Sequence, residues 1–272
     1  MGRPAIQDGE SSLARGLRLL DIFSVTNTEL SISELARRSG IPKSTAHRLV
    51  SDLVGWGALE RGPNGVRLGV HLLELGHLVP VQRLREMAIP FAHNLNEVTH
   101  LTANLAIRDG QDILYVEKIS SRSVRVPHTR AGGRLPVHCT ALGKAILAYS
   151  DRDFIESVLG GTLRPLSPKT IIDPGELRRE LAAIRETKVA YDVEESRTGL
   201  FCVAAPVFAH RTVVGAISVT GATALEHAQH FAPVVRTTAM ALSRMLEVRR
   251  SAPLADRTAG RAGHSRDGAF GA

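Results

Sequence analysis

Apolar positions in residues 31–54 follow two short helical repeats separated by a tight turn. Ser31, with Glu34 three residues later, forms a capping box that predicts the start of a helix, and Gly40 can take the positive φ that ends one. A second helix is predicted over 42–54, because its apolar residues recur at i, i+3, i+4 and i+7: Ala46, Leu49, Val50 and Leu53. The pattern indicates a helix-turn-helix whose second helix has one buried stripe.

The opposite face of the 42–54 helix carries small hydrogen-bonding side chains and a guanidinium. Side chains of this kind suit the base edges and phosphates of a DNA major groove. The candidates are Lys43, Ser44, Thr45, His47, Arg48 and Ser51. A polar face that is only solvated is the alternative, and the helix pattern alone does not exclude it.

Two strand-like pieces, 58–61 and 66–68, follow the helix pair and flank Gly62-Pro63-Asn64-Gly65. Asn-Gly favours a β-hairpin, because both residues tolerate positive φ. Arg61 and Arg67 flank the turn, where cations can meet the DNA backbone. Arg15 on the polar side of an earlier helix is either a further phosphate contact or an ordinary surface arginine. The order of helix, turn, helix and hairpin predicts a winged helix-turn-helix, and we favour DNA binding for it.

Apolar residues also predict a helix before this module and another after it. Residues 12–23 place Leu13, Leu17 and Leu20 on one face, which predicts a helix packed beneath the helix pair. Residues 68–79 are mostly apolar, and we interpret 70–80 as a linker helix. Its apolar side chains are expected to pack against a second subunit or, alternatively, against the chain's own second domain. The DNA-binding domain is expected over 12–69.

Beyond residue 80 helical and alternating segments are interleaved, which predicts an α+β domain over 81–248 around one antiparallel sheet. Helices are expected at 83–98, 140–149, 174–188 and 227–250. Strands are expected at 101–107, 112–119, 123–127, 189–193, 201–208 and 213–220. In the first strand Thr102, Asn104 and Ala106 form the face opposite the apolar one, so we expect the strand to be half-buried. The tail, 249–272, is expected to be disordered.

Composition narrows the partners and the compartment. A chain of 272 residues is long enough for two domains, and its formal net charge of +7 is compatible with nucleic-acid binding. The sequence has no apolar signal-peptide core and no run of about 18 apolar residues, so export and membrane spanning are not expected. Cys139 and Cys202 are its two cysteines and provide no disulfide framework, which favours the reducing cytoplasm.

Several polar residues of the second domain have both a ligand-binding and a structural interpretation. Free amides at the start of the helix that contains Lys144 can receive an anion such as a carboxylate, but Thr140 can also be a plain N-cap and Lys144 a solvated lysine. The hydroxyls of Ser218 and Thr220 are either ligand contacts or satisfied core groups.

Catalytic and metal chemistry have no positive motif. His138 beside Cys139 suggests a base and a nucleophile, but neighbours on a strand point to opposite faces. With Cys202 and Asp192 these residues lack the compact spacing of metal ligands. We therefore predict no enzyme, no cofactor and no metal. A small-molecule enzyme or a metal-binding domain that uses Cys139 and Cys202 is the alternative.

Four segments together resemble the IclR family of bacterial transcriptional regulators, over about residues 12–248. They are SLARGLRLLDIF (12–23), LARRSGIPKSTAHRLVSDLVGWGALER (35–61), GGRLPVHCTALGKAILA (132–148), and the stretch from Asp192 through GLFCVAAPVF (199–208) to GAISVTG (215–221). The third segment is the specific one, because helix-turn-helix patterns occur in many families.

The resemblance implies a winged helix-turn-helix, a linker helix and an effector-binding domain of GAF-like fold. It also implies dimers or tetramers on palindromic DNA operators, controlled by a small organic acid or aromatic effector. The effector contacts that it implies are Thr140, Ala141, Leu142, Asp192, Cys202, Ser218 and Thr220. Ala141 and Leu142 stand where some relatives have smaller residues, which would make that wall narrower or more apolar.

Overall fold

The computed structural model describes residues 11–121, 126, 129–222 and 225–251. The chain divides into two compact units, residues 1–82 and 83–272. The strand expected at 123–127 and nearly all of the tail expected to be disordered lie outside the described residues. The domain boundaries expected from the sequence stay predictions.

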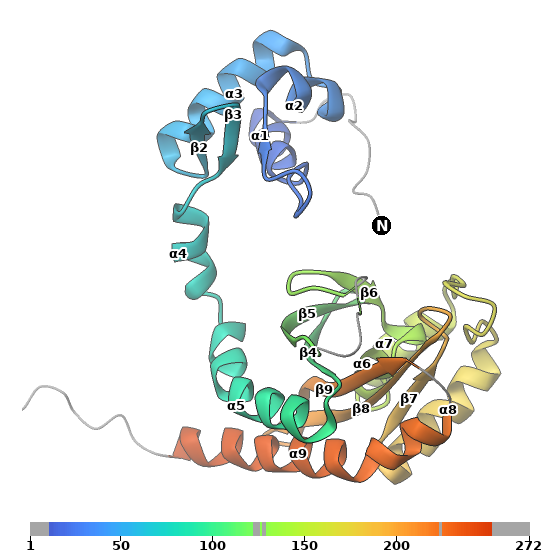
Figure 1. Ribbon diagram of the computed structural model, residues 1–272. Helices are drawn as coiled ribbons and strands as arrows, with labels where there is room; N and C mark the ends of the chain where they lie inside the picture. Colours follow the sequence, from blue (N-terminus) through green and yellow to red (C-terminus); the bar gives the residue numbers. More distant parts are fainter. Residues whose placement is uncertain (1–10, 122–125, 127–128, 223–224, 252–272) are drawn as a thin grey trace, which may run out of the picture. The chain divides into compact units, whose positions relative to one another are not determined.

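Helices and a small antiparallel sheet form the first unit (Figure 1). Its elements are α1 (Ser12–Leu20), β1 (Glu29–Leu30), α2 (Ile32–Ser39), α3 (Lys43–Trp56), β2 (Leu59–Gly62), β3 (Gly65–Leu68) and α4 (His71–His77). The sheet has the strand order β1-β3-β2, and β1 is a strand that the sequence pattern does not predict. Leu19, Leu35, Ala46 and Val66 belong to one core that joins the helices to the sheet. The winged helix-turn-helix is confirmed.

The local signals around α2 act as predicted, with one difference. Ser31 Oγ accepts a hydrogen bond from Glu34 N at 3.2 Å, and Gly40 ends the helix at φ 70°. The Glu34 carboxylate binds Arg37 and Arg38 instead of closing the capping box. These hydrogen bonds lower the pKa of Glu34 to about 2.

The predicted wing hairpin is confirmed, but Asn64 and Gly65 do not together form its corner. Gly62 pairs with Gly65, so Pro63 and Asn64 form the corner, and Asn64 is not in the positive-φ region. Glu29 of β1 determines the turn instead: its Oε1 accepts from Asn64 N at 2.6 Å, and a Cβ on Gly62 would lie 2.4 Å from the same oxygen. A contact over a long sequence separation replaces the local preference.

The helix predicted before the module is present and packs against α2 and α3, but its predicted apolar face is wrong, and the helix predicted after the module is shorter than expected. Leu13 and Leu17 are 73% and 50% exposed, and Gly16 and Leu19 form the buried side of α1 instead. The helix expected over 68–79 is shorter, because Leu68 ends β3 and α4 begins at His71. The apolar side chains of Leu73 and Leu78 on and after α4 are exposed.

A six-stranded antiparallel sheet forms the second unit, with the strand order β6-β5-β4-β9-β8-β7. Its strands are β4 (Thr102–Asp109), β5 (Asp112–Ile119), β6 (Arg134–Pro136), β7 (Ala190–Val193), β8 (Leu200–Ala209) and β9 (Thr212–Ala222). The helices are α5 (Val81–Thr99), α6 (Ala141–Leu147), α7 (Arg152–Leu159), α8 (Pro174–Thr187) and α9 (Leu225–Ser251). The predicted α+β architecture around one antiparallel sheet is confirmed, whereas β6 and α7 are not predicted by the sequence pattern.

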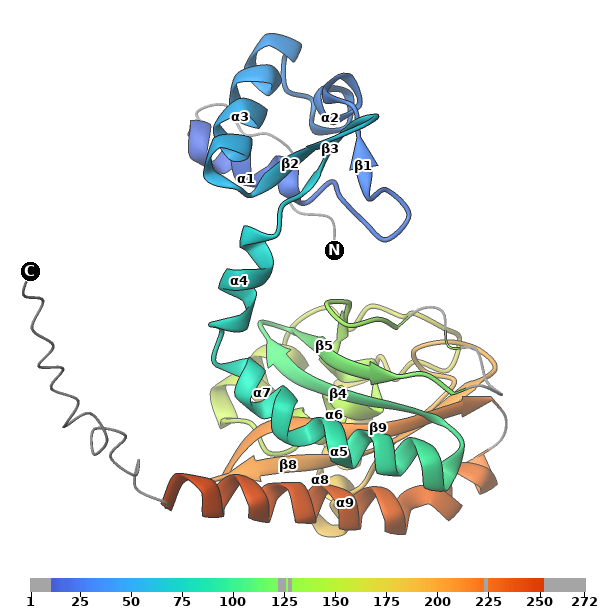
Figure 2. The ribbon, with the colours of Figure 1, turned by 60° about the vertical axis from the view of Figure 1, so that its left-hand side comes forward.

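Helices cover both faces of this sheet, with α5 and α9 on one side and α6 on the other (Figure 2). Leu105, Val203 and Ile217 face the α5/α9 side, while Cys202, Ala204 and Ala216 face the α6 side. The expectation of a half-buried first strand is therefore wrong, since Thr102 and Asn104 are only 0% and 1% exposed. A polar side chain on β4 lies inside the protein and needs partners there.

Candidate functional sites

The polar face of α3 is uncovered in the structure. Ala46, Leu49 and Val50 are buried on one side of the helix. On the other side Lys43, Ser44, His47, Arg48 and Ser51 are exposed, and Thr45 is partly exposed. Arg48 makes only a long hydrogen bond of 3.5 Å, from its Nη2 to Ser12 Oγ, with the described part of the chain. These side chains are therefore accessible to a partner.

The other cations predicted to meet DNA differ in availability. Arg61 in β2 is exposed. Arg67 is exposed too, but its Nη2 lies 3.2 Å from Glu60 Oε2, so a neighbouring carboxylate offsets its charge. Arg15 is partly buried, and its Nε has no hydrogen-bond partner among the residues that the structure describes. Of the three, Arg61 is the most accessible cation.

An apolar groove of about 410 Å³ lies along α1, α3 and α4. Its lining includes Leu13, Leu17, Leu53, Trp56 and Leu72. Leu13, Leu17 and Trp56 are each at least half exposed, so the groove is an open hydrophobic surface.

Polar side chains gather on the α6 side of the large sheet. In register, Cys202 pairs with Thr220 and with Asp192, and Asn104 pairs with Ser218. Asn104 Nδ2 donates to Ser218 Oγ at 3.4 Å and to Thr220 Oγ1 at 3.2 Å. The structure thus brings four of the predicted effector residues together and adds Asn104, which the sequence reasoning missed. Its only sequence signal is a polar residue within a strand.

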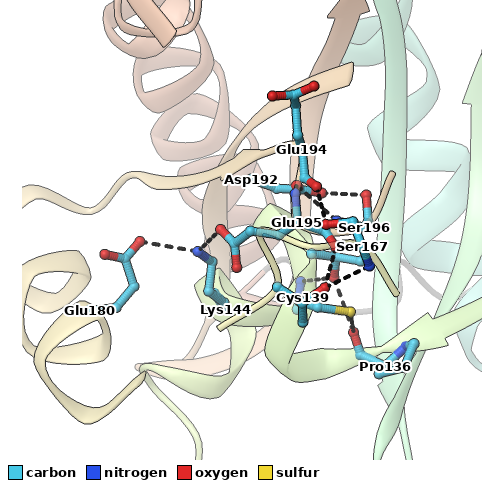
Figure 3. A network of polar contacts seen from close by, with 12 residues as sticks. Pro136, Cys139, Lys144, Ser167, Glu180, Asp192, Glu194, Glu195 and Ser196 are labelled. Carbon is cyan, nitrogen blue, oxygen red and sulfur yellow. Dashed lines mark hydrogen bonds and ion pairs between the residues drawn. The ribbon is translucent and has the colours of Figure 1, made fainter. Parts of the chain in front are cut away.

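Asp192 is 3% exposed, and its carboxylate accepts hydrogen bonds from the loop that follows it in the chain (Figure 3). Its Oδ1 accepts from Glu195 N at 2.8 Å and from Ser196 N at 3.1 Å, and its Oδ2 accepts from Ser196 Oγ at 2.5 Å. Burial raises the pKa of Asp192, although these hydrogen bonds oppose the shift. The carboxylate therefore shapes residues 192–196 at the end of β7.

Lys144 is 1% exposed, which excludes the interpretation as a solvated lysine. Its Nζ lies 2.5 Å from Glu195 Oε1 and 3.2 Å from Glu180 Oε1 (Figure 3). Burial acts to lower the pKa of Lys144, but the two carboxylates outweigh it, so Lys144 stays protonated. Burial raises the pKa of Glu195 to about 7. This network links α6, α8 and the 192–196 loop.

The start of α6 has the geometry of an ordinary N-cap. Thr140 Oγ1 accepts from Gly143 N at 3.0 Å. Ala141 and Leu142 follow in the first turn and share an apolar cluster with Cys202. The N-cap interpretation of Thr140 is confirmed. The residues of this turn lie on the same side of the sheet as Asn104, Cys202, Ser218 and Thr220.

Neither cysteine has the environment of a nucleophile. Burial raises the pKa of Cys139 to about 12 and that of Cys202 to about 12. A thiol with a raised pKa is unreactive. Residues 137–139 form a 3₁₀ turn, so the expectation that His138 and Cys139 are strand neighbours is wrong, and His138 Nε2 contacts Arg164 O at 3.1 Å instead of a thiol.

Metal-ligating side chains do not cluster in the described part of the second unit or of the first. Within these residues, no group of three or more His, Cys, Asp or Glu side chains is placed to hold a metal ion.

None of the helices in the described ranges is both long and apolar enough to cross a membrane.

Both units match domain models of one protein family. The model of the IclR helix-turn-helix domain matches residues 12–63, and the model of the bacterial transcriptional regulator IclR C-terminal domain matches residues 77–244. The chain belongs to the IclR family. The resemblance of the four sequence segments is thereby confirmed.

Characterised IclR-family relatives are transcriptional regulators. The HTH-type transcriptional regulator XynR of Escherichia coli is 35% identical over 243 residues, which are 86% of this chain and 96% of XynR. The transcriptional repressor IclR of E. coli is 31% identical over 217 residues, or 77% of this chain and 79% of that protein. The chain is accordingly a DNA-binding transcriptional regulator of the IclR type, and these relatives are regulators, not enzymes.

Solved IclR-family structures share the fold. An IclR homologue of Microbacterium hydrocarbonoxydans, complexed with 4-hydroxybenzoate, has a TM-score of 0.81 at 32% identity over 89% of this chain and all of that one. The Thermotoga maritima IclR has a TM-score of 0.73 at 28% identity over 86% of this chain and 98% of that one.

Proposed function

We propose that this regulator acts in the cytoplasm and binds a palindromic operator as a dimer, with α3 of each protomer in a major groove. The observation that carries this proposal is the uncovered polar face of α3 beside an intact wing. Ser44, His47 and Arg48 would contact base edges, while Lys43, Arg61 and Arg67 would contact phosphates. A two-fold dimer would contact half-sites separated by about one helical turn or a multiple of it.

Selection from random duplex DNA supplies an operator, and fluorescence anisotropy then measures its affinity. Arg48→Ala should weaken specific binding roughly tenfold or more, because a guanidinium that binds a base edge contributes about 1–3 kcal/mol of discrimination. Arg179→Ala is the matched control, an exposed arginine on α8 of the other unit. Equal operator affinity of Arg48→Ala and the parent would show that α3 is not the recognition helix.

The proposed partner across the dimer is a second copy on the apolar surface of α1 and α4. The groove lined by Leu17 and Trp56 and the exposed Leu73 give this unit an open apolar surface, which supports an interface with another chain. Leu73→Asp should lower the dimer fraction in sedimentation velocity, since a charge in an apolar interface is desolvated without a partner. Val25→Asp, at a 71% exposed site outside the groove, is the control. If the parent is a tetramer and Leu73→Asp reduces it to a dimer, a second interface must hold that dimer together. If the dimer fraction of Leu73→Asp equals that of the parent, this surface is not the dimer interface.

The second unit would bind a small organic acid that shifts the population of DNA-competent dimers. Support comes from the buried polar row of Cys202, Ser218 and Thr220, and from the relative that is complexed with 4-hydroxybenzoate. The remaining contacts would come from Thr140, Ala141, Leu142 and Asp192. Such a ligand must bind one state more tightly than the other.

A thermal-shift panel of small aliphatic and aromatic acids tests the effector proposal, because a ligand that binds only the native state raises Tm. Acids that raise Tm should also change operator affinity. Ser218→Ala should reduce the shift, whereas Ser157→Ala, on the exposed side of α7, should not. An acid that stabilises the protein without any change in operator affinity would argue against regulation by this unit.

A further inference from the structure

The amide of Asn104 is only half satisfied by the residues that the structure describes. Its Nδ2 has two hydroxyl acceptors on β9, Ser218 and Thr220. Its Oδ1 is buried and accepts no hydrogen bond from any described residue. A buried amide oxygen without a donor is unfavourable and uncommon in native proteins. Within the described part of the chain, Asn104 therefore presents an unpaired acceptor in the middle of β4.

The neighbouring hydrogen bonds determine which end of this amide is free. The Thr220 hydroxyl donates its single proton to Cys202 Sγ at 3.3 Å. Thr220 Oγ1 can then only accept from Asn104, which must present its NH₂ group there. The free atom is the carbonyl oxygen, so the partner that is missing is a hydrogen-bond donor.

Lys118 is the register partner of Asn104 on β5 and bears on the kind of donor that fits. Its Nζ donates to the carbonyl oxygen of Val126 and, at 2.7 Å, to that of Thr129. The Thr129 hydroxyl is buried and has no partner among the described residues.

A hydroxyl group suits these surroundings better than an ammonium does. It can donate to Asn104 Oδ1 without bringing a further positive charge beside Lys118. An ammonium cannot accept, and it would face the positive charge of Lys118. The same positive charge favours a ligand that is an anion overall.

We propose that Asn104 hydrogen-bonds a hydroxyl group of the effector, and that the effector is a hydroxylated organic acid. This inference rests on the proposed binding of a small acid by the second unit and specifies its chemistry. Asn104 would be the residue that distinguishes a hydroxy acid from the same acid without the hydroxyl, because the deoxy ligand leaves the buried oxygen unpaired.

Matched acid pairs test the proposal by isothermal titration calorimetry on the full chain. The probes are benzoate with 4-hydroxybenzoate, benzoate with 3-hydroxybenzoate, and propionate with lactate. In at least one pair the hydroxylated acid should bind the parent protein about tenfold more tightly, equivalent to about 1.4 kcal/mol. Asn104→Leu should reduce this ratio to near one by weakening the hydroxylated member, with little change for its partner.

Thr102→Val is the control for a general loss of polarity on β4. Thr102 lies on the same face, is 0% exposed, and already accepts a hydrogen bond from Ser121 N at 3.1 Å. It should keep the full hydroxyl preference. Asn104→Val, which suits a strand and has no acceptor, replaces Asn104→Leu if the latter does not fold. A crystal structure of the parent with the tighter probe should place a ligand hydroxyl about 2.5–3.0 Å from Asn104 Oδ1.

The outcomes distinguish a failure of the role of Asn104 from a failure of small-acid binding by the second unit. If acids bind but the parent shows no hydroxyl preference, or if Asn104→Leu keeps that preference, the role of Asn104 is refuted while acid binding stands. If no probe binds the parent, binding of small acids fails, and the inference fails with it.

Discussion

Removing the buried ammonium of Lys144 should destabilise the second unit far more than removing an exposed charge does. Lys144→Met keeps most of the length of the side chain and removes the charge. Glu195 is then left with neither of its carboxylate oxygens paired, because its Oε2 has no partner within the described residues even now. Glu180, whose side chain is 31% exposed, can regain water instead.

The expected cost follows from these two environments. Deleting one partner of a buried ion pair typically costs about 3–5 kcal/mol. Since one of the two carboxylates can be hydrated, we expect the lower end, about 3 kcal/mol. The loss of unfolding free energy should also grow with pH. Near pH 5 Glu195 can be protonated and neutral in the folded variant. Near pH 8 it must either be buried as an unpaired anion or stay protonated at a pH where an exposed carboxyl group would be ionised.

Urea unfolding of the full chain at pH 5, 7 and 8 measures this effect. Far-UV circular dichroism follows both units, while the single tryptophan, Trp56, lies in the first unit and provides an internal control whose transition should not move. Lys169→Met is the matched variant, since Lys169 pairs with Glu194 but its side chain is 61% exposed. Such a surface pair contributes at most about 1 kcal/mol.

Lys144→Met combined with Glu195→Gln isolates the pair. The double variant should recover part of the loss, because no unpaired carboxylate remains at position 195. The reasoning is refuted if Lys144→Met costs no more than Lys169→Met, or if its cost is the same at pH 5 and pH 8.

Protonation, backbone crowding and helix capping each make a further prediction about stability. The pKa of Glu195 is about 7 in the folded protein against an ordinary 4.5, so between these pH values the folded state binds a proton that the unfolded state does not. The free energy of unfolding should therefore fall by up to about 3 kcal/mol as pH rises from 4.5 to 7. Glu195→Gln should remove this dependence of stability on pH. Gly143→Ala should lower Tm by several degrees in differential scanning fluorimetry, because a Cβ there would lie 2.2 Å from Val137 O; a wild-type Tm would exclude this crowding. Ser31→Ala should cost about 1 kcal/mol in the Trp56 transition, whereas Ser33→Ala, two residues beyond the cap, should cost less; equal costs would deny the capping role.

Local signals were sufficient to predict the helix pair of the DNA-binding module. The cap at Ser31, the positive-φ end at Gly40 and the stripe of Ala46, Leu49 and Val50 each act within one or two helical turns. Such interactions depend on neighbours in the chain, so the sequence alone determined both the helix pair and the polar face left on α3. The contacts of that face with DNA remain a prediction.

Tertiary structure decided everything that depended on what packs against an element. Periodicity assigned Leu17 to a buried face and Asn104 to an open one, and both assignments were wrong. The partners of Lys144 lie 36 and 51 residues away in the chain, so no local pattern reveals that its charge is buried. Spacing along the sequence determines which side chains share a face. Only the pairing of distant segments determines whether that face meets water, apolar side chains or a charge.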